Sequence, residues 1–113
     1  MDKLKPAYLL DDIKKLIKDD RYLLTVTAQK TAYSVGYTSE MVADVILNLE
    51  RNDFYKSTNE FNNPKAWQDV YKTRVENYLD VYIKLKITEI NRQTLLILSF
   101  KENEGYSKKR REY

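Results

Sequence analysis

Two short segments of the chain carry side chains that suit chemistry on a phosphodiester. They read Asp-Phe-Tyr-Lys-Ser at 53–57 and Trp-Gln-Asp-Val-Tyr at 67–71. Both are rich in strand-forming residues, and side chains two positions apart on a strand point to the same face. We therefore expect Gln68, Lys72 and Arg74 on one face of a sheet. Amide, phenol, ammonium and guanidinium groups with few carboxylates suit a phosphodiester better than an apolar ligand.

The composition is that of one small folded domain. A chain of 113 residues can bury one modest core but not two. Charged residues make up 33% and hydrophobic residues 42%, which is typical of a folded rather than a disordered protein. The sequence has no Cys, which excludes a disulfide framework and a thiolate metal site. It also has no His, and no close group of Asp and Glu is apparent, so we expect no metal site.

No part of the sequence indicates a membrane protein. The longest apolar run, Leu95–Leu98, is far too short to cross a bilayer. The first six residues lack the apolar core of a signal peptide. We therefore expect a cytoplasmic protein without membrane contact.

The net charge of +3 is unevenly placed. The first 81 residues carry 12 Lys/Arg and 13 Asp/Glu, whereas the last 32 residues carry 8 and 4. This basic surplus is a mild signature of nucleic-acid binding. Part of it is the run Lys-Lys-Arg-Arg at 108–111, and we expect residues 103–113 to form a disordered basic tail.

Three segments with helical periodicity precede the strand-rich part. The first has two Asp in its first turn and an apolar stripe of Leu10, Ile13, Leu16 and Ile17. A second, short helix is expected over about 28–34, with Thr27 as its cap and Gly36 ending it. A third begins near Thr38 or Ser39. Its apolar side consists of Met41, Val42, Val45, Ile46 and Leu49.

From about residue 53 the pattern changes to strands. Alternation over 81–87 predicts that Val81 and its alternate neighbours face the helices, whereas Tyr82, Lys84 and Lys86 face away. The sequences Asn-Asn-Pro at 62–64 and Asn-Arg-Gln at 91–93 predict a loop and a hairpin. The run 94–101 is apolar enough to be a central strand. Helices followed by an antiparallel meander predict an α+β fold, with the N-terminal helices on one face of a small antiparallel sheet.

Four short motifs in the strand-rich part of the chain resemble those of a known family. The chain resembles the MqsR (motility quorum-sensing regulator) family of bacterial type II toxins through Asp-Phe-Tyr-Lys-Ser at 53–57, Trp-Gln-Asp-Val-Tyr at 67–71, Tyr-Ile-Lys-Leu at 82–85 and Leu-Ser-Phe-Lys-Glu at 98–102. The resemblance implies one domain over 1–102, with helices at about 9–50 and a sheet at about 53–102. It implies a RelE-like fold and an endoribonuclease that cleaves messenger RNA without a metal or cofactor. It also implies a partner antitoxin, which in this family commonly joins a zinc-binding domain to a helix-turn-helix domain.

The resemblance assigns site residues position by position. Lys56, Gln68 and Tyr82 match the family's principal active-site residues. Tyr55, Lys72 and Lys101 match accessory positions that would bind RNA. The sheet-face argument adds two further expected RNA-binding residues, Arg74 and Lys84.

The chemistry of RNA cleavage suits this set of residues. RNA supplies its own nucleophile, the 2′-hydroxyl, so the protein must orient it in line, neutralise charge on the phosphorane and move protons. Without His, Lys and Tyr are the remaining candidates for proton transfer. Neighbouring cations would lower the pKa of Lys56 enough for it to act as a base. Otherwise Lys56 stays protonated and stabilises the phosphorane, and Tyr82 or the substrate handles the protons. The sequence leaves both schemes open.

Each candidate also has a simpler explanation when it is taken alone. Lysines such as Lys56 and Lys84 can be solvated residues that discourage strand pairing. The sequence favours a core position for Trp67 and a surface position for the carboxylates of Glu60 and Asp69. The alternative function is a non-catalytic RNA-binding regulatory module that uses the same face for backbone contact and stacking. A mere binder would not need this combination of Lys, Gln and Tyr, so the sequence favours the enzyme.

Overall fold

The computed structural model describes residues 2–59, 63, 66–89 and 92–103. Within them, three helices and one mostly antiparallel sheet of six strands confirm the α+β class. The helices are α1 (Leu10–Lys18), α2 (Val26–Ser34) and α3 (Ser39–Leu47), with a short 3-10 turn at Arg51–Asp53. The strands are β1 (Asp2–Lys3), β2 (Tyr22–Leu24), β3 (Phe54–Thr58), β4 (Gln68–Val75), β5 (Leu79–Thr88) and β6 (Thr94–Glu102).

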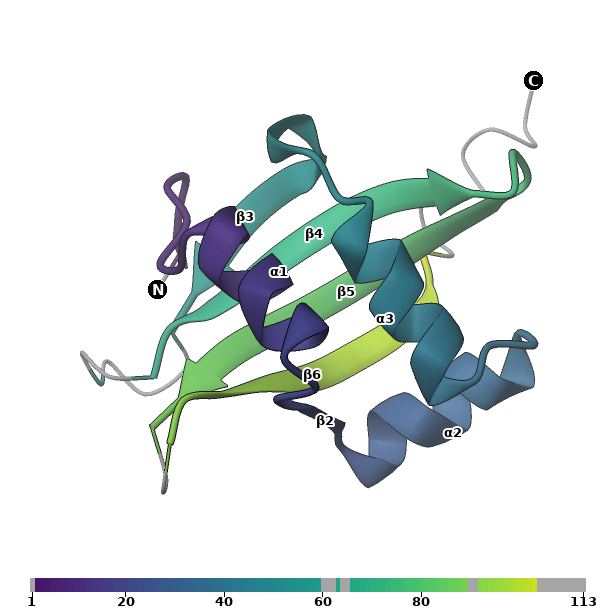
Figure 1. Ribbon diagram of the computed structural model, residues 1–113. Helices are drawn as coiled ribbons and strands as arrows, with labels where there is room; N and C mark the ends of the chain where they lie inside the picture. Colours follow the sequence, from purple (N-terminus) through teal and green to yellow (C-terminus); the bar gives the residue numbers. More distant parts are fainter. Residues whose placement is uncertain (1, 60–62, 64–65, 90–91, 104–113) are drawn as a thin grey trace.

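The sheet has the strand order β1-β3-β4-β5-β6-β2. Strands β3 to β6 form the expected antiparallel meander, and β2 adds to β6 in parallel. Helices α1 and α3 lie across one face of this sheet, and α2 lies beside the β6 edge (Figure 1). Strands β1 and β2 were not expected, because two or three residues are too few to show an alternating pattern.

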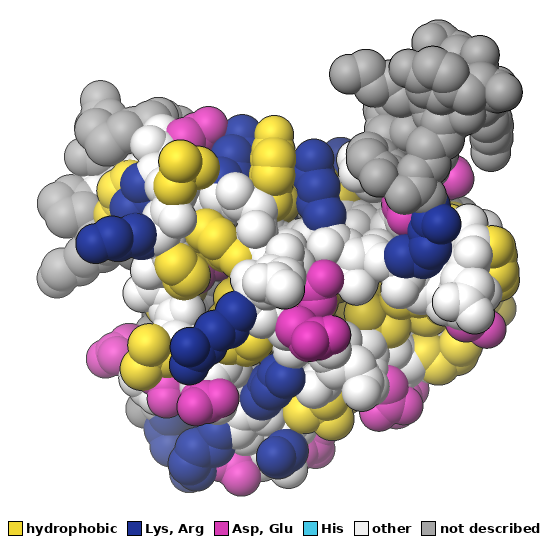
Figure 2. Space-filling view, turned by 90° about the horizontal axis from the view of Figure 1, so that it is seen from above, with side chains coloured by type: hydrophobic (Ala, Val, Ile, Leu, Met, Phe, Trp, Pro, Cys, Tyr) yellow, Lys and Arg dark blue, Asp and Glu magenta, His cyan; other side chains and the backbone are white. Residues whose placement is uncertain are grey.

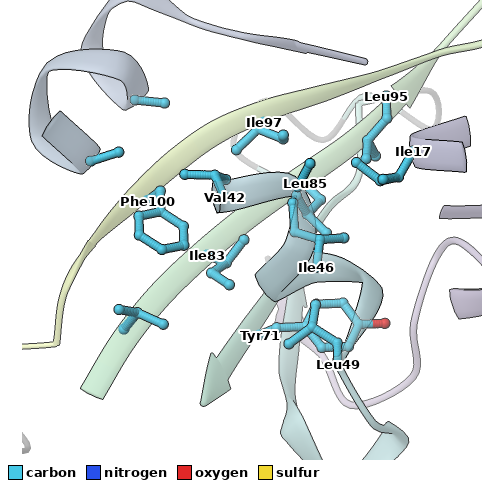
Figure 3. Packing of buried hydrophobic residues seen from close by; sticks show 14 of the residues in the cluster. Ile17, Val42, Ile46, Leu49, Tyr71, Ile83, Leu85, Leu95, Ile97 and Phe100 are labelled. Atoms are coloured by element: carbon cyan, nitrogen blue, oxygen red, sulfur yellow. The ribbon is translucent and has the colours of Figure 1, made fainter. Parts of the chain in front are cut away.

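The hydrophobic core lies between the sheet and the helices. Val81, Ile83 and Leu85 of β5 are fully buried, which confirms the predicted alternation. Residues from α1 and α3, including Ile17 and Ile46, pack against them (Figure 3). Full burial of such a side chain contributes about 1.5–3 kcal/mol, so this face of the sheet supplies most of the stability.

Helix ends follow the expected capping chemistry with one correction. The Thr38 hydroxyl accepts a hydrogen bond from the Met41 N–H at 3.2 Å and caps α3. Helix α2 is capped by Thr25 and not by Thr27, and the Thr25 hydroxyl accepts from the Ala28 N–H at 3.1 Å. Both threonines are good caps, but β2 ends at Leu24, so the chain turns into the helix two residues earlier than predicted.

The outer edge of β6 is closed by α2 beyond the short β2 strand. The Thr31 hydroxyl donates to the Phe100 carbonyl at 2.7 Å, and the Thr25 hydroxyl donates to the Leu98 carbonyl at 3.3 Å. The Thr25 N–H donates to the Ile97 carbonyl at 3.1 Å. These bonds satisfy carbonyl groups that an open sheet edge would offer to another chain.

The segment before α1 is held on the sheet by Asp69, which corrects the expectation of a surface carboxylate. Asp69 is fully buried. Its two oxygens accept the Ala7 N–H at 2.9 Å and the Tyr8 N–H at 3.0 Å. The Tyr8 hydroxyl donates to the Trp67 carbonyl at 2.7 Å. The Trp67 ring is only half-buried and lies outside the main core, so the expected core position for Trp67 was wrong.

Some expectations fall on residues that the structure does not describe. Glu60, Asn62, Pro64 and Asn91 lie outside the described residues, as does the tail from 104 to 113. The antiparallel pairing of β5 with β6, which ends at Thr88 and Thr94, agrees with a hairpin between them. In the described part of the chain, no helix is long and apolar enough to span a membrane.

Candidate active site

The candidate residues lie on the sheet face opposite α1 and α3. Register brings three of them into one row, in which Lys72 of β4 is opposite Tyr82 of β5, and Tyr82 is opposite Lys101 of β6. Directly opposed residues in antiparallel strands have Cβ atoms about 4.5–5.5 Å apart. The Lys101 Nζ lies 5.2 Å from the centre of the Tyr82 ring. The Tyr82 phenol is therefore flanked by lysines from both neighbouring strands.

The next row on the same face is built around Val70. Lys56 of β3 and Lys84 of β5 are its cross-strand partners. Val70 is fully buried although it does not belong to the main core cluster. Lysine stems cover apolar surface in this way while their ammonium groups stay in water. This row therefore places two more ammonium groups on the face, one on each side of an apolar floor.

Tyr55 occupies an irregularity in β3. The pairing with β4 shifts between Phe54 and Lys56, which leaves Tyr55 as the extra residue of a β-bulge. Its side chain is 47% exposed. The Lys72 Nζ lies 3.6 Å and the Lys56 Nζ 5.6 Å from the centre of the Tyr55 ring. Such cation–π contacts join the exposed phenol to both rows of lysines.

Lys56 has a carboxylate partner that the sequence analysis did not predict. The Lys56 Nζ lies 3.0 Å from the Asp2 Oδ2. The hydrogen bond that the Lys56 ammonium donates to Asp2 is the main reason why the pKa of Lys56 lies above its ordinary value. Burial opposes this effect, and the charges of Asp2, Tyr55 and Tyr82 reinforce it. The charge of Tyr82 makes the smallest of these contributions, and it comes from β5 on the same face of the sheet.

Gln68 lies on the same face but at its border. It is the first residue of β4 and is opposite Thr58 of β3. Its diagonal neighbour across β3 is Lys56, and such diagonal pairs are about 7–8 Å apart. Two same-face steps along β4, about 13 Å, separate Gln68 from Lys72. The structure therefore brings Gln68 near Lys56 rather than near Tyr82.

Arg74 is engaged by a carboxylate. Its Nε donates to the Asp80 Oδ1 at 2.9 Å, and its Nη2 donates to the Asp80 Oδ2 at 3.1 Å. Asp80 is its cross-strand partner and is only 9% exposed. The bidentate fork that would hold a phosphate is thus already paired. Among the candidates on this face, Arg74 is the one with the weakest geometric case for binding RNA.

Two hollows adjoin the lysine rows. One of about 350 Å³ includes Lys72, Arg74 and Asp80 in its lining. The other, of about 650 Å³, lies between the end of α2 and the end of β6. Its lining consists of Thr31, Ser34, Val35, Tyr82, Lys101, Glu102 and Asn103.

The cluster of lysines is confined to the open face of the sheet and is not a property of the whole surface. Both signs of charge are mixed on the side of the molecule seen in Figure 2, in keeping with a net charge of only +3. The open sheet face differs because four lysines converge there with two tyrosines, and the lysines are Lys56, Lys72, Lys84 and Lys101. Among the described residues, no three Asp or Glu side chains are grouped closely enough to hold a metal ion.

Asp2 is the site residue that sequence reasoning missed. It belongs to a strand of two residues and lies 54 positions from Lys56 in the chain. A single acidic residue near the start of a chain gives no local pattern that would link it to a lysine so far away. The pairing of β1 with β3 places it there.

Comparisons with known proteins identify the family. Residues 5–102 match the family model described as motility quorum-sensing regulator, toxin of MqsA. The chain is 35% identical over 102 residues to the mRNA interferase toxin MqsR of Escherichia coli (strain K12). This match covers 90% of the chain and 99% of the relative. It includes the strands that carry both rows of lysines, so the resemblance read from the sequence motifs is confirmed and the chain belongs to the MqsR toxin family.

Proposed function

We propose that this chain is the toxin of a type II toxin–antitoxin system and cleaves messenger RNA on the open face of its sheet. The family and the E. coli relative, which is named an mRNA interferase toxin, support the activity. The family description, toxin of MqsA, supports an antitoxin partner. A partner with a zinc-binding domain and a helix-turn-helix domain, a RelE-like packing and action in the cytoplasm, where messenger RNA is translated, belong to the same proposal.

The observation that carries the proposal is the row of Lys72, Tyr82 and Lys101 with Lys56 beside it. During cleavage the 2′-oxygen forms a bond to phosphorus while the bond from phosphorus to the 5′-oxygen breaks. Negative charge grows on the phosphorane, and ammonium groups placed in advance stabilise that charge. A phenol in the middle of the row is within reach of a phosphate held by its neighbours. The products are a 2′,3′-cyclic phosphate and a 5′-hydroxyl.

The structure favours one of the two roles that the sequence left open for Lys56. A lysine acts as a base near neutral pH only if its pKa is lowered. Asp2 instead raises the pKa of Lys56. We therefore assign the protonated Lys56 to stabilisation of the phosphorane. Tyr82 then donates a proton to the departing 5′-oxygen, and a non-bridging phosphate oxygen of the substrate accepts the proton that the 2′-hydroxyl loses.

The remaining candidates bind and orient the RNA. Gln68, as the diagonal neighbour of Lys56, offers a neutral hydrogen bond to the scissile phosphate. Lys84 and Lys101 neutralise flanking phosphates. Tyr55 is exposed enough for a base to stack on its ring, and Lys72 holds that ring in place.

Single-turnover cleavage of a messenger RNA in the presence of EDTA tests the function. We expect fragments with a 5′-hydroxyl end from the wild-type chain. Lys56→Ala should abolish cleavage without changing the thermal melt, because this side chain lies outside the core. Tyr82→Phe should slow cleavage roughly 10²–10⁴-fold if the phenol transfers a proton.

Lys86→Ala is the matched control, because Lys86 lies on the same face of β5 but outside both rows. It should cleave at nearly the wild-type rate. A folded Lys56→Ala protein with wild-type activity would remove the centre of the proposal. Cleavage that required Mg²⁺ or left a 5′-phosphate would contradict the 2′-hydroxyl mechanism. Intact RNA over a wide range of wild-type concentrations would indicate a binding module instead.

A further inference from the structure

Asp2 is a carboxylate that the fold brings from a distant part of the chain to the candidate catalytic lysine. Its Oδ2 lies 3.0 Å from the Lys56 Nζ. The pairing of β1 with β3 sets Asp2 opposite Thr58 and Lys3 opposite Ser57. The hydrogen bond from Lys56, and after it a hydrogen bond from Thr58, lower the pKa of Asp2. Asp2 is thus an ionised group with two partners next to the site.

The segment that carries Asp2 is fixed at several points. Lys3 places its Nζ 4.1 Å from the centre of the Trp67 ring. A few residues later, the buried Asp69 accepts two backbone hydrogen bonds from Ala7 and Tyr8. The position of Asp2 therefore follows from backbone pairing and from a buried anchor, and does not depend on its ion pair alone.

A carboxylate at this place changes what Lys56 can do. The titratable groups around Lys56 are Tyr55 beside it on β3, Lys72 on β4, and Tyr82 and Lys84 on β5 beyond β4. Lysines close together favour loss of a proton from one of them. Asp2 counters this repulsion and takes one of the three N–H donors of the ammonium group. Within the described part of the chain, Asp2 is the hydrogen-bond partner of the Lys56 ammonium, so two donors remain for a phosphate.

We infer that Asp2 is a positioning residue for the cleavage reaction, which holds the Lys56 ammonium charged and oriented toward the scissile phosphate. This inference rests on the proposed function, because it requires Lys56 to meet the RNA. It adds a residue to the site that lies outside the four sequence motifs and outside the 5–102 match to the family model.

Asp2→Asn, Asp2→Glu and the control Asp11→Asn test the inference. Asp11 is an exposed acid in the first turn of α1, so its substitution makes the same chemical change away from the site. We expect Asp2→Asn to slow single-turnover cleavage roughly 3- to 10-fold with an unchanged thermal melt. Asp2→Glu, which keeps the charge, should recover part of the rate. Asp11→Asn should match the wild type.

The ionisation of Lys56 gives a readout that a structural role would not change. Because Asp2 raises the pKa of Lys56, its loss should lower that pKa. Cleavage that needs the ammonium form is lost as pH rises through this pKa, so the alkaline limit of activity should move to lower pH in Asp2→Asn. Titration of the lysine side-chain amines by NMR should show the same shift without RNA, and none in Asp11→Asn.

Two results would overturn the inference. One is an Asp2→Asn protein with a wild-type rate and an unchanged pKa of Lys56. The other is faster cleavage by Asp2→Asn, which would mean that Asp2 competes with the phosphate for Lys56. Lys56→Ala separates these failures from failure of the proposed function. If Lys56→Ala is inactive and Asp2→Asn is normal, only the role of Asp2 is wrong; if a folded Lys56→Ala cleaves normally, the assignment of Lys56 falls first.

Discussion

Replacing Asp69 with asparagine tests the anchor that holds the N-terminal segment on the sheet. The buried carboxylate accepts the Ala7 N–H at 2.9 Å on one oxygen and the Tyr8 N–H at 3.0 Å on the other. An asparagine has nearly the same shape, but one end of its amide is an NH₂ group that cannot accept a hydrogen bond. One backbone donor therefore loses its partner in Asp69→Asn.

The size of the effect follows from burial and charge. A hydrogen bond to a charged group contributes about 1.5–3 kcal/mol, and a buried donor without a partner costs about 1–3 kcal/mol. Both ranges describe the same loss, so the free energy of unfolding should fall by about 1.5–3 kcal/mol. In a domain of this size, the corresponding fall in Tm is roughly 10–20 °C. Asp11→Asn, on the exposed first turn of α1, should cost less than about 1 kcal/mol.

Thermal and urea unfolding of the two variants provide the measurement. If Asp69→Asn had the same Tm as Asp11→Asn, Asp69 would not be the anchor and the reasoning would fail. A second readout links the anchor to the site. Well below its Tm, Asp69→Asn should lose about as much cleavage as Asp2→Asn, because a loosened segment no longer places Asp2. A protein that carries both Asp2→Asn and Asp69→Asn should then lose little more cleavage activity than either single variant. If the two effects were independent, the fold-losses in rate would multiply.

Three further predictions concern stability and binding. The pKa of Tyr71 is raised to about 12, first by burial and then by Asp69 and Asp53, so the neutral phenol is favoured in the folded state. The stabilisation that results is complete below pH 10 and is lost as the pH rises to about 12. In denaturant unfolding over that interval, the free energy of unfolding of Tyr71→Phe should therefore fall by about 2 kcal/mol less than that of the wild type. Arg74→Ala should lower the free energy of unfolding by about 1–2 kcal/mol because Asp80 loses the two hydrogen bonds from Arg74. It should slow cleavage less than Lys72→Ala, and equal slowing would contradict the pairing. Tyr55→Phe should keep the wild-type affinity for a 2′-deoxy-substituted RNA, whereas Tyr55→Ala should lose about 1–3 kcal/mol of binding free energy if a base stacks on the ring. Equal affinities of Tyr55→Phe and Tyr55→Ala would refute stacking.

The elements with a clear period were predictable from sequence. Alternation in β5 identified which side chains enter the core, and Thr38 marked the start of α3. Met41 was expected on the apolar side of α3 but is 40% exposed, because the helix turns that position away from the sheet. Short elements such as β1 and β2 have no period to read, so the sheet was expected to be smaller and wholly antiparallel.

Strand alternation predicted that the candidate side chains share one sheet face, but it did not predict how they are arranged there. Motifs and strand alternation selected the residues, yet the row of Lys72, Tyr82 and Lys101 depends on register. Register depends on hairpin geometry and on irregularities such as the bulge at Tyr55, which a sequence pattern does not reveal. The pairing of Arg74 with Asp80 has the same origin, because it follows from the β4–β5 register.

The two faces of the sheet can change independently of each other. Residues that alternate along β5 belong either to the core or to the open face, so neighbours in sequence are under different constraints. Random substitution at positions 72, 84 and 101, with Lys56, Gln68 and Tyr82 kept, should alter which RNA sequences are cut while the packing against α1 and α3 stays intact. Val70 is the exception, since it is buried on the open face. Keeping Val70 while varying its neighbours gives a defined library for selecting toxins with new cleavage preferences.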